Sequence, residues 1–265
     1  MDKPYDGRLS PRIVIPAKTG IRKGHGCPIR SGMTNLVYLI AGLILVLGFV
    51  FSGCREKPES KGSESEKAEI EIGASKTIVG LGDSLTAGLG VDESWAYPAQ
   101  LERRLVSDGY NITVVNAGIS GETSSGTLSR MDWVITSLKP DYVILVIGAN
   151  DGMRGIDTGL LRKNLDQIIS ILQKNHIKIL FGGMEMLPNL GIRYAEEFKK
   201  VYSEIALKHN LLFIPFFLEG VAGEGRYNQN DGIHPTAEGY ARIVDHIYPY
   251  VLKLVNDGSP TSLTL

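Results

Sequence analysis

Two distant segments of the chain hold side chains that could together carry out nucleophilic catalysis. Asp83 and Ser84 interrupt an apolar run in IVGLGDSLTAGLG, and Asp231 and His234 lie near the other end of the chain in NDGIHP. A serine hydroxyl is a weak nucleophile unless a base removes its proton, and that base is usually a histidine oriented by a carboxylate. One tight turn can hold His234 beside Asp231, although an isolated Asp-x-x-His also fits an ordinary turn.

His234 is the candidate base because its position differs from that of the other four of the five histidines. His25 precedes a long apolar segment, while His176 and His209 each lie between a predicted helix and a predicted strand, where a solvated turn residue is expected. His246 lies in the last predicted helix, where it can face solvent or make a structural hydrogen bond. Only His234 lies in a late loop just before a helix.

The elements that must position these residues follow from the hydrophobic pattern. Short apolar runs alternate with longer amphipathic segments from about residue 76 onward. Runs that are apolar throughout are typical of strands in a parallel sheet covered on both faces. The sequence therefore predicts an α/β fold, a three-layer α/β/α sandwich with a five-stranded parallel sheet in one domain. The predicted strands are 76–82, 111–119, 141–151, 177–183 and 211–216, and the predicted helices are 97–109, 126–138, 160–176, 193–210 and 236–256.

Three polar clusters follow the first three predicted strands. They are Gly82 to Ser84, Asn116 to Gly118 and Gly148 to Asp151. Ligands of open parallel sheets bind at the carboxyl ends of the strands, so these clusters are expected to converge at one site.

Four sequence blocks together resemble a known enzyme family. They are GDSLTAGLG, NAGISG, GAND at 148–151 and DGIHP at 231–235, and they occur in the order found in the GDSL, or SGNH, hydrolases. The resemblance extends over about residues 76–255. The flanking phrases SWAYPAQL, GANDGMRGI and PFFLEGVAG are similar to the branch that contains bacterial arylesterases and acyl-CoA thioesterase/lysophospholipases. The flavodoxin-like fold of that family agrees with the predicted sheet.

The resemblance implies a role for each site residue. Ser84 would be the nucleophile, His234 the general base and then acid, and Asp231 the residue that orients the imidazole. The oxyanion hole would consist of the Ser84 N–H, the Gly118 N–H and the Asn150 side-chain amide, which stabilise the charge of a tetrahedral intermediate. Glycine at position 118 would let the substrate approach the main chain.

Two loops are expected to shape an acyl pocket. GMRGIDTG follows Asn150, and MEMLPNLGIRY follows the fourth strand. Apolar, partly flexible side chains suit acyl chains of different lengths, although residues that merely pack beneath a loop have the same composition. The predicted substrate-binding residues are Met153, Ile156, Met184 and Leu187.

The N-terminal region resembles that of a bacterial lipoprotein. Residues 36–51, LVYLIAGLILVLGFVF, are uncharged and match the hydrophobic part of a signal peptide, whereas a spanning helix needs about 20 apolar residues. The following Ser52, Gly53 and Cys54 resemble a lipobox, although Phe51 stands where leucine is usual. The resemblance implies cleavage before Cys54 and lipidation of its sulfur. An uncleaved signal anchor with an incidental cysteine is the alternative.

These features predict four regions. Residues 1–53 form an extension and signal peptide, starting at Met1 or Met33, and 54–75 form the lipidated cysteine and a Glu-, Lys- and Ser-rich tether. Residues 76–257 form the hydrolase domain and 258–265 a tail. The expected location is the cell envelope, with the enzyme lipid-anchored to a bacterial membrane and facing the periplasm or exterior.

Composition argues against several other classes of function. The formal net charge is −1 and the sequence pI is about 6.5, so no basic field is available to attract nucleic acid. The two cysteines, Cys27 and Cys54, both precede the folded region and lack zinc-type spacing. We therefore expect no metal and no cofactor; the sequence predicts no oligomeric state.

The predicted function is a serine esterase that works through a covalent acyl-enzyme. Expected substrates are lysophospholipids, aryl or short-chain esters, and acyl thioesters. A carbohydrate O-acetyl esterase is one alternative, because the same blocks serve deacetylation. A surface lipoprotein that binds a ligand without catalysis is another, and the joint presence of Ser84, Asp231, His234 and Asn150 argues against it.

Overall fold

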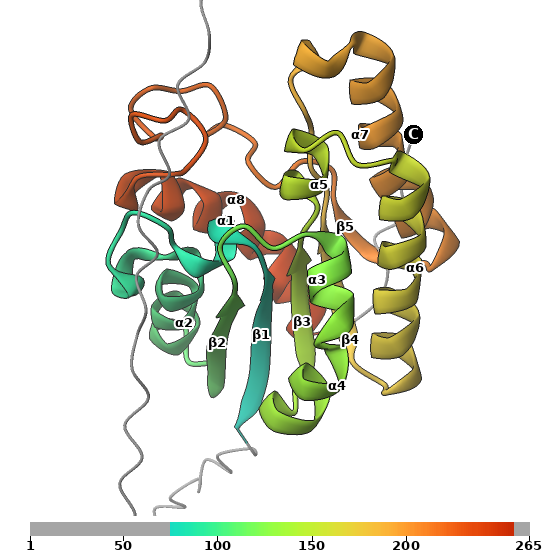
Figure 1. Cartoon of the computed structure of the whole chain (residues 1–265). Helices are drawn as coiled ribbons and strands as arrows, with labels where there is room; N and C mark the ends of the chain where they lie inside the picture. The colour runs from blue at the N-terminus through green and yellow to red at the C-terminus, as the bar shows by residue number, and fades with distance from the viewer. Residues whose placement is uncertain (1–74, 257–265) are drawn as a thin grey trace, which may run out of the picture. The chain divides into compact units, whose positions relative to one another are not determined.

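The structure is a computed structural model, and it describes residues 75–256. The predicted signal segment, Cys54, nearly all of the predicted tether and the predicted tail lie outside these residues. Five parallel strands form one sheet in the order β2-β1-β3-β4-β5, which confirms the predicted fold class (Figure 1). The strands are β1 (Lys76–Gly82), β2 (Ile112–Gly118), β3 (Tyr142–Val146), β4 (Lys178–Gly182) and β5 (Leu212–Ile214).

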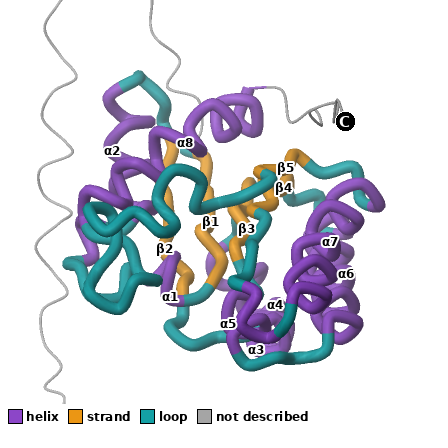
Figure 2. The backbone as a smooth tube through the Cα atoms, turned by 90° about the horizontal axis from the view of Figure 1, so that it is seen from above, coloured by secondary structure: helices purple, strands orange, loops and turns teal. Residues whose placement is uncertain are grey.

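Helices cover both faces of the sheet. One face carries α2 and α8, and the other carries α3, α6 and α7 (Figure 2). The helices are α1 (Ser84–Ala87), α2 (Tyr97–Ser107), α3 (Ser124–Ser129), α4 (Met131–Trp133), α5 (Ala149–Met153), α6 (Thr158–Lys174), α7 (Ile192–Lys208) and α8 (Ala237–Asn256). Short 3-10 turns cover Glu93–Trp95 and Pro188–Leu190.

The core follows from the apolar patterns of the sequence. Every residue of β3 is buried, as expected for a central strand covered on both faces. In α6, five apolar residues recur at helical spacing and lie in the core, so one stripe of this helix packs on the sheet. These buried residues are Leu161, Leu165, Ile168, Ile169 and Leu172.

One predicted helix is interrupted. The sequence pattern predicts a continuous helix over 126–138, but the backbone leaves helical geometry at Arg130, which separates α3 from α4 and a π-helical segment, Val134–Leu138. The Arg130 guanidinium turns back and donates to Glu122 Oε1 and Oε2 at 2.8 and 2.6 Å and to the Ala117 carbonyl at 2.7 Å. Both charged side chains are largely buried, so pairing offsets the desolvation of each.

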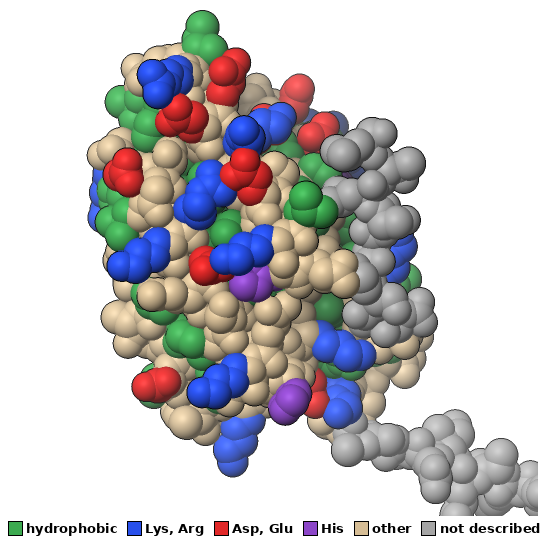
Figure 3. All heavy atoms as spheres, turned by 90° about the vertical axis from the view of Figure 1, so that its right-hand side faces the viewer, with side chains coloured by type: hydrophobic (Ala, Val, Ile, Leu, Met, Phe, Trp, Pro, Cys, Tyr) green, Lys and Arg blue, Asp and Glu red, His purple; other side chains and the backbone are tan. Residues whose placement is uncertain are grey.

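The outer surface of α6 and α7 carries charges of both signs. Figure 3 shows Lys and Arg side chains interspersed with Asp and Glu on this side of the molecule. Lys208 lies 2.6 Å from Asp166, and Arg162 pairs with Glu204. Within residues 75–256, no helix combines the length and apolar character that crossing a membrane requires.

The strand register brings the ends of three strands to one level. Gly82, the last residue of β1, pairs with Gly118 of β2 and with Val146 of β3. The chain order reverses between β1 and β3, which is the point where parallel sheets of this order open a crevice at their carboxyl edge. The polar clusters after these strands therefore meet at one place.

Gly118 is required for the packing of α1 against β2. A Cβ added to Gly118 would lie 2.2 Å from the Ala87 backbone nitrogen and 2.7 Å from its Cα. Real side chains do not approach a backbone so closely, and the backbone of α1 cannot move without displacing Ser84 at its start.

We predict that Gly118→Ala lowers the free energy of unfolding by about 2 kcal/mol, because overpacking forces α1 away from the sheet. Urea denaturation measures this change. Gly225→Ala is the matched control, since a Cβ there meets no atom within 4 Å, and a change within about 0.5 kcal/mol is expected. Equal stability of the two variants would contradict the proposed packing role.

Candidate active site

Ser84 lies at the start of α1, directly beyond β1. The Asp83 side chain caps this helix by accepting a hydrogen bond from the Leu85 N–H at 3.0 Å, and the Asp83 carbonyl accepts from Thr86 and Ala87 at 3.1 and 2.9 Å. These hydrogen bonds of Asp83 hold the turn that presents Ser84. A Cβ on Gly82 would lie 2.2 Å from the Val146 carbonyl oxygen, so only glycine allows the turn to begin this close to β3.

The structure brings Ser84, His234 and Asp231 together. Ser84 Oγ lies 2.9 Å from His234 Nε2, and His234 Nδ1 lies 2.7 Å from Asp231 Oδ2. When Nδ1 carries the proton shared with the carboxylate, Nε2 is free to accept the hydroxyl proton. The geometry therefore suits proton transfer from the serine to the imidazole.

A tight turn fixes the carboxylate of this arrangement. Asp231 Oδ1 accepts hydrogen bonds from the backbone N–H groups of Ile233 and His234, both at 3.0 Å. The Ile233 N–H, followed by the His234 side chain and backbone, lowers the pKa of Asp231 to about 2. The carboxylate therefore remains charged beside the imidazole, where a negative charge stabilises the imidazolium.

Gln229 was not predicted from the sequence, and it holds the histidine loop against the serine loop. Its backbone N–H donates to the His234 carbonyl at 2.7 Å, and its Nε2 donates to the carbonyls of Leu89 and Pro235 at 2.7 and 2.9 Å. Its place two residues before the DGIHP block is the only sequence signal, because a polar residue in a polar loop has no distinguishing pattern.

Asn150 approaches the same turn from the segment that follows β3. It lies in α5, is nearly buried, and its Nδ2 donates to Asp83 Oδ2 at 3.4 Å. Burial raises the pKa of Asp83 to about 6, although the hydrogen bonds from Leu85 and Asn150 act in the opposite direction. Asp83 thus links the amide of Asn150 to the turn that carries Ser84.

Gly118 does not supply a free N–H group, which corrects the predicted oxyanion hole. Its N–H donates to Asn116 Oδ1 at 3.0 Å, and its missing side chain leaves room for α1 rather than for substrate. Gly121, the second glycine of NAGISG, lies in a turn closed by the Glu122 N–H and the Ile119 carbonyl at 3.1 Å, with a φ of 79°. Among the hydrogen bonds of residues 75–256, its N–H has no acceptor.

The predicted pocket residues fall into two groups. Met153, at the end of α5, is 43% exposed, and Leu187, in the loop after β4, is 76% exposed. Ile156 is half-buried. Met184 is only 4% exposed and belongs to the core. The structure therefore exposes little of Met184 for the predicted contact with substrate, because the first residues of that loop pack inward.

Two of the other described histidines, His246 and His209, make structural contacts. His246 Nε2 lies 3.0 Å from the Phe216 carbonyl, and His209 lies between Asp166 and Gln173 at 2.6 and 3.0 Å. In residues 75–256, no group of three or more His, Cys, Asp or Glu side chains has the geometry to hold a metal ion.

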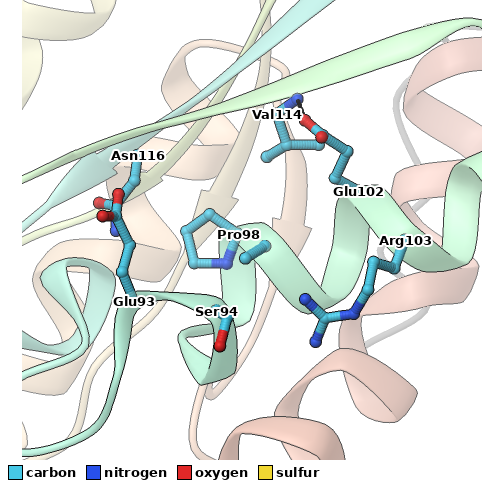
Figure 4. Close-up of a pocket in the computed structure, with 8 residues that line it drawn as sticks. Glu93, Ser94, Pro98, Glu102, Arg103, Val114 and Asn116 are labelled. Atoms are coloured by element: carbon cyan, nitrogen blue, oxygen red, sulfur yellow. Dashed lines mark hydrogen bonds between the residues drawn. The ribbon is translucent and has the colours of Figure 1, made fainter.

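A separate hollow of about 210 Å³ lies between α2 and the outer strand β2 (Figure 4). Glu102 and Arg103 of α2 line it together with Val114 and Asn116 of β2. Neither Ser84 nor His234 is among its lining residues, and Glu102 is already engaged, accepting from the Val114 N–H at 2.5 Å. This hollow is distinct from the serine site.

Comparison with known proteins identifies the family of the chain. The GDSL-like Lipase/Acylhydrolase family profile matches residues 81–242. Esterase TesA of Pseudomonas aeruginosa is 38% identical over 182 residues, which are 69% of this chain and 90% of that protein. Thioesterase 1/protease 1/lysophospholipase L1 of Escherichia coli is 34% identical over 186 residues, covering 70% of this chain and 88% of the relative.

A solved structure shows the same relationship. AlinE4, described as an SGNH-hydrolase family esterase, is 40% identical, with a TM-score of 0.58 over 69% of this chain and 98% of that one. The sequence profile, the relatives and the solved structure all indicate the same family. The chain belongs to the GDSL-like lipase/acylhydrolase family and is a serine hydrolase of ester bonds.

Proposed function

We propose that Ser84 is the nucleophile, His234 the general base and acid, and Asp231 the residue that orients His234. The observation that carries this proposal is the unbroken pair of hydrogen-bond contacts from Ser84 Oγ to His234 Nε2 and from His234 Nδ1 to Asp231. Each member has the partner that its role needs, because a hydroxyl requires a base and a base requires orientation.

The reaction then proceeds in two halves. Ser84 Oγ attacks the carbonyl carbon while its proton passes to His234 Nε2, and the imidazolium gives that proton to the departing alkoxide, which leaves as an alcohol. A water molecule next attacks the acyl-serine while His234 accepts one of its protons. Collapse of the second tetrahedral intermediate returns the proton to Ser84 Oγ and releases the carboxylic acid.

The oxyanion of each intermediate would be stabilised by the Ser84 N–H, the Gly121 N–H and Asn150 Nδ2. The first two N–H groups have no acceptor among the hydrogen bonds of the described residues, and Asn150 is anchored beside the serine turn by Asp83. Neutral donors fixed in place stabilise developing charge without reorganisation, and each contributes about 3 kcal/mol.

We further propose acyl esters as substrates, including lysophospholipids, aryl and short-chain esters, and acyl thioesters. Exposed apolar side chains after β3 and β4, at Met153 and Leu187, offer contact area to an acyl chain. The names of the relatives, which include esterase and thioesterase/lysophospholipase, support the same range. An acetyl group would use little of this apolar surface, which favours longer acyl chains over carbohydrate O-acetyl esters.

The proposed location is the cell envelope, with the chain attached to a membrane through a lipid on Cys54. The apolar segment 36–51 followed by Ser52, Gly53 and Cys54 supports this attachment. A single acyl group gives only reversible binding, so a diacylglycerol on the cysteine is the kind of anchor that holds a domain stably.

We predict that Ser84→Ala lowers kcat on p-nitrophenyl butyrate by at least about 10³-fold, because the acyl-enzyme can no longer form. Activity is measured beside the wild type on oxygen esters, thioesters, a lysophospholipid and an acetylated sugar, with circular dichroism as the control for folding. Undiminished turnover by a folded variant would exclude Ser84 as nucleophile. Wild-type activity confined to acetylated sugars would support the deacetylase alternative instead.

We predict that Cys54→Ser abolishes incorporation of labelled palmitate into the full-length chain expressed in bacteria. It should also move the protein from the membrane fraction to the supernatant, since the sulfur that carries the lipid is missing. The matched control is Cys27→Ser, which removes the other cysteine and should leave labelling intact. Label that persists in the Cys54 variant would show that the anchor lies elsewhere.

A further inference from the structure

A buried carboxylate outside the serine, histidine and aspartate arrangement connects two loops of the site. Asp151 is 1% exposed, and both of its oxygens are engaged by one residue. Oδ2 accepts from the Ser124 N–H at 2.8 Å, and Oδ1 accepts from the Ser124 hydroxyl at 2.6 Å. Ser124 is completely buried, so this two-point link is shielded from water.

A third helix braces the link. Asn164 of α6 is buried, and its Nδ2 donates to Ser124 Oγ at 2.9 Å and to Ser125 Oγ at 2.8 Å. The hydroxyl of Ser124 therefore donates to Asp151 while it accepts from Asn164. The result is a polar chain that runs from α6 through the start of α3 to α5, in which Ser124, Asp151 and Asn164 are buried.

The two ends of the Asp151–Ser124 link lie next to the proposed oxyanion donors. Asp151 directly follows Asn150, and Ser124 lies three residues after Gly121. A second contact joins the same two segments at the surface, where exposed Arg154 donates from Nη2 to the Gly121 carbonyl at 2.9 Å. The loop after β2 and the helix after β3 are thus tied twice, once inside and once outside.

We propose that Asp151 is a positioning residue that sets the separation between the Gly121 N–H and the Asn150 amide. This inference rests on the proposed function, because it concerns the donors assigned there. β2 and β3 are not neighbours, since β1 lies between them, and no ladder hydrogen bond fixes one loop relative to the other. The buried link supplies that constraint, and the exposed Arg154 contact adds little because water competes for it.

The chemical consequence is specific to the transition state. A donor misplaced by about 1 Å loses much of its interaction with the oxyanion, and such a displacement lowers the rate by about 10²-fold. Substrate binding relies on the acyl group and is less affected. Loss of the link should therefore lower kcat and leave KM nearly unchanged.

The test compares Asp151→Ala, Asp151→Asn and Ser124→Ala with the wild type on p-nitrophenyl butyrate. Affinity for a trifluoromethyl ketone, which forms an oxyanion with the serine, is the second readout. We expect Asp151→Ala to lower kcat by about 100-fold while KM stays within about twofold of the wild-type value. The affinity for the ketone should fall by about the same factor as kcat. Asp151→Asn, which retains an acceptor for the Ser124 N–H, should recover most of the rate.

Ser124→Ala keeps the backbone N–H bond and removes the hydroxyl bond, so we expect a smaller loss of kcat, about 5- to 10-fold by partial displacement. If Asp151→Ala fails to fold, Ser124→Ala and Asp151→Asn still test the proposal. Asp141→Ala is the matched control, because Asp141 accepts from the Thr77 N–H and Lys76 Nζ, both at 2.8 Å, at the start of β1. It should lower the melting temperature without changing kcat.

Two results would overturn the proposal. One is a folded Asp151→Ala or Ser124→Ala with the kcat of the Asp141→Ala control. The other is a loss of kcat in Asp151→Ala that comes without weaker binding of the ketone, or without recovery of kcat in Asp151→Asn. If Ser84→Ala is inactive while the Asp151 and Ser124 variants match the wild type, only this inference fails; turnover by Ser84→Ala would reject the proposed function itself.

Discussion

One contact, between Ser84 Oγ and His234 Nε2, joins two segments that lie 150 residues apart in the sequence. The rest of the site depends on keeping this contact in place. The serine side is fixed by a helix that begins where β1 ends, and the histidine side by the Asp231 turn and by Gln229, which reaches across to the Leu89 carbonyl. The parallel sheet provides the rigid edge on which both sides meet.

Four buried polar side chains lie around this edge, and each of them has a hydrogen-bond partner. Asp83, Asn150, Asp151 and Asn164 are all nearly inaccessible to water, and unpaired groups of this kind would cost about 2 kcal/mol or more each. Their hydrogen bonds run to the backbone of the serine turn and to the starts of α3 and α5. The same bonds that compensate for burial therefore restrict the geometry of the site, which is how a preorganised site is built.

Much of the fold and of the site was predictable because it depends on local pattern. Uniformly apolar runs indicated parallel strands, the helical stripe of 160–176 indicated its buried face, and the Asp-x-x-His spacing allowed the turn that Asp231 and His234 form. The joint location of the polar clusters followed from the rule that strand ends share an edge. These inferences needed no knowledge of which side chains pack together.

The sequence did not reveal which residues pack against one another in the folded chain. Gly118 was expected to let substrate approach the main chain, but the approaching backbone is that of α1, and only the packed structure distinguishes these. Met184 belongs to an apolar loop sequence that is typical of a ligand pocket, but its side chain lies in the core. The break at Arg130 depends on a partner, Glu122, which lies outside the predicted helix.

The most direct test of the account is covalent labelling with a fluorophosphonate ester, followed by peptide mass spectrometry, in the wild type and in His234→Ala. The proposed roles of Ser84 and His234 predict a single adduct on Ser84 and a labelling rate at least about 10²-fold lower without the imidazole, since a general base contributes about 10²- to 10⁴-fold. An adduct on a different residue, or an equal rate in a folded His234→Ala variant, would contradict these roles.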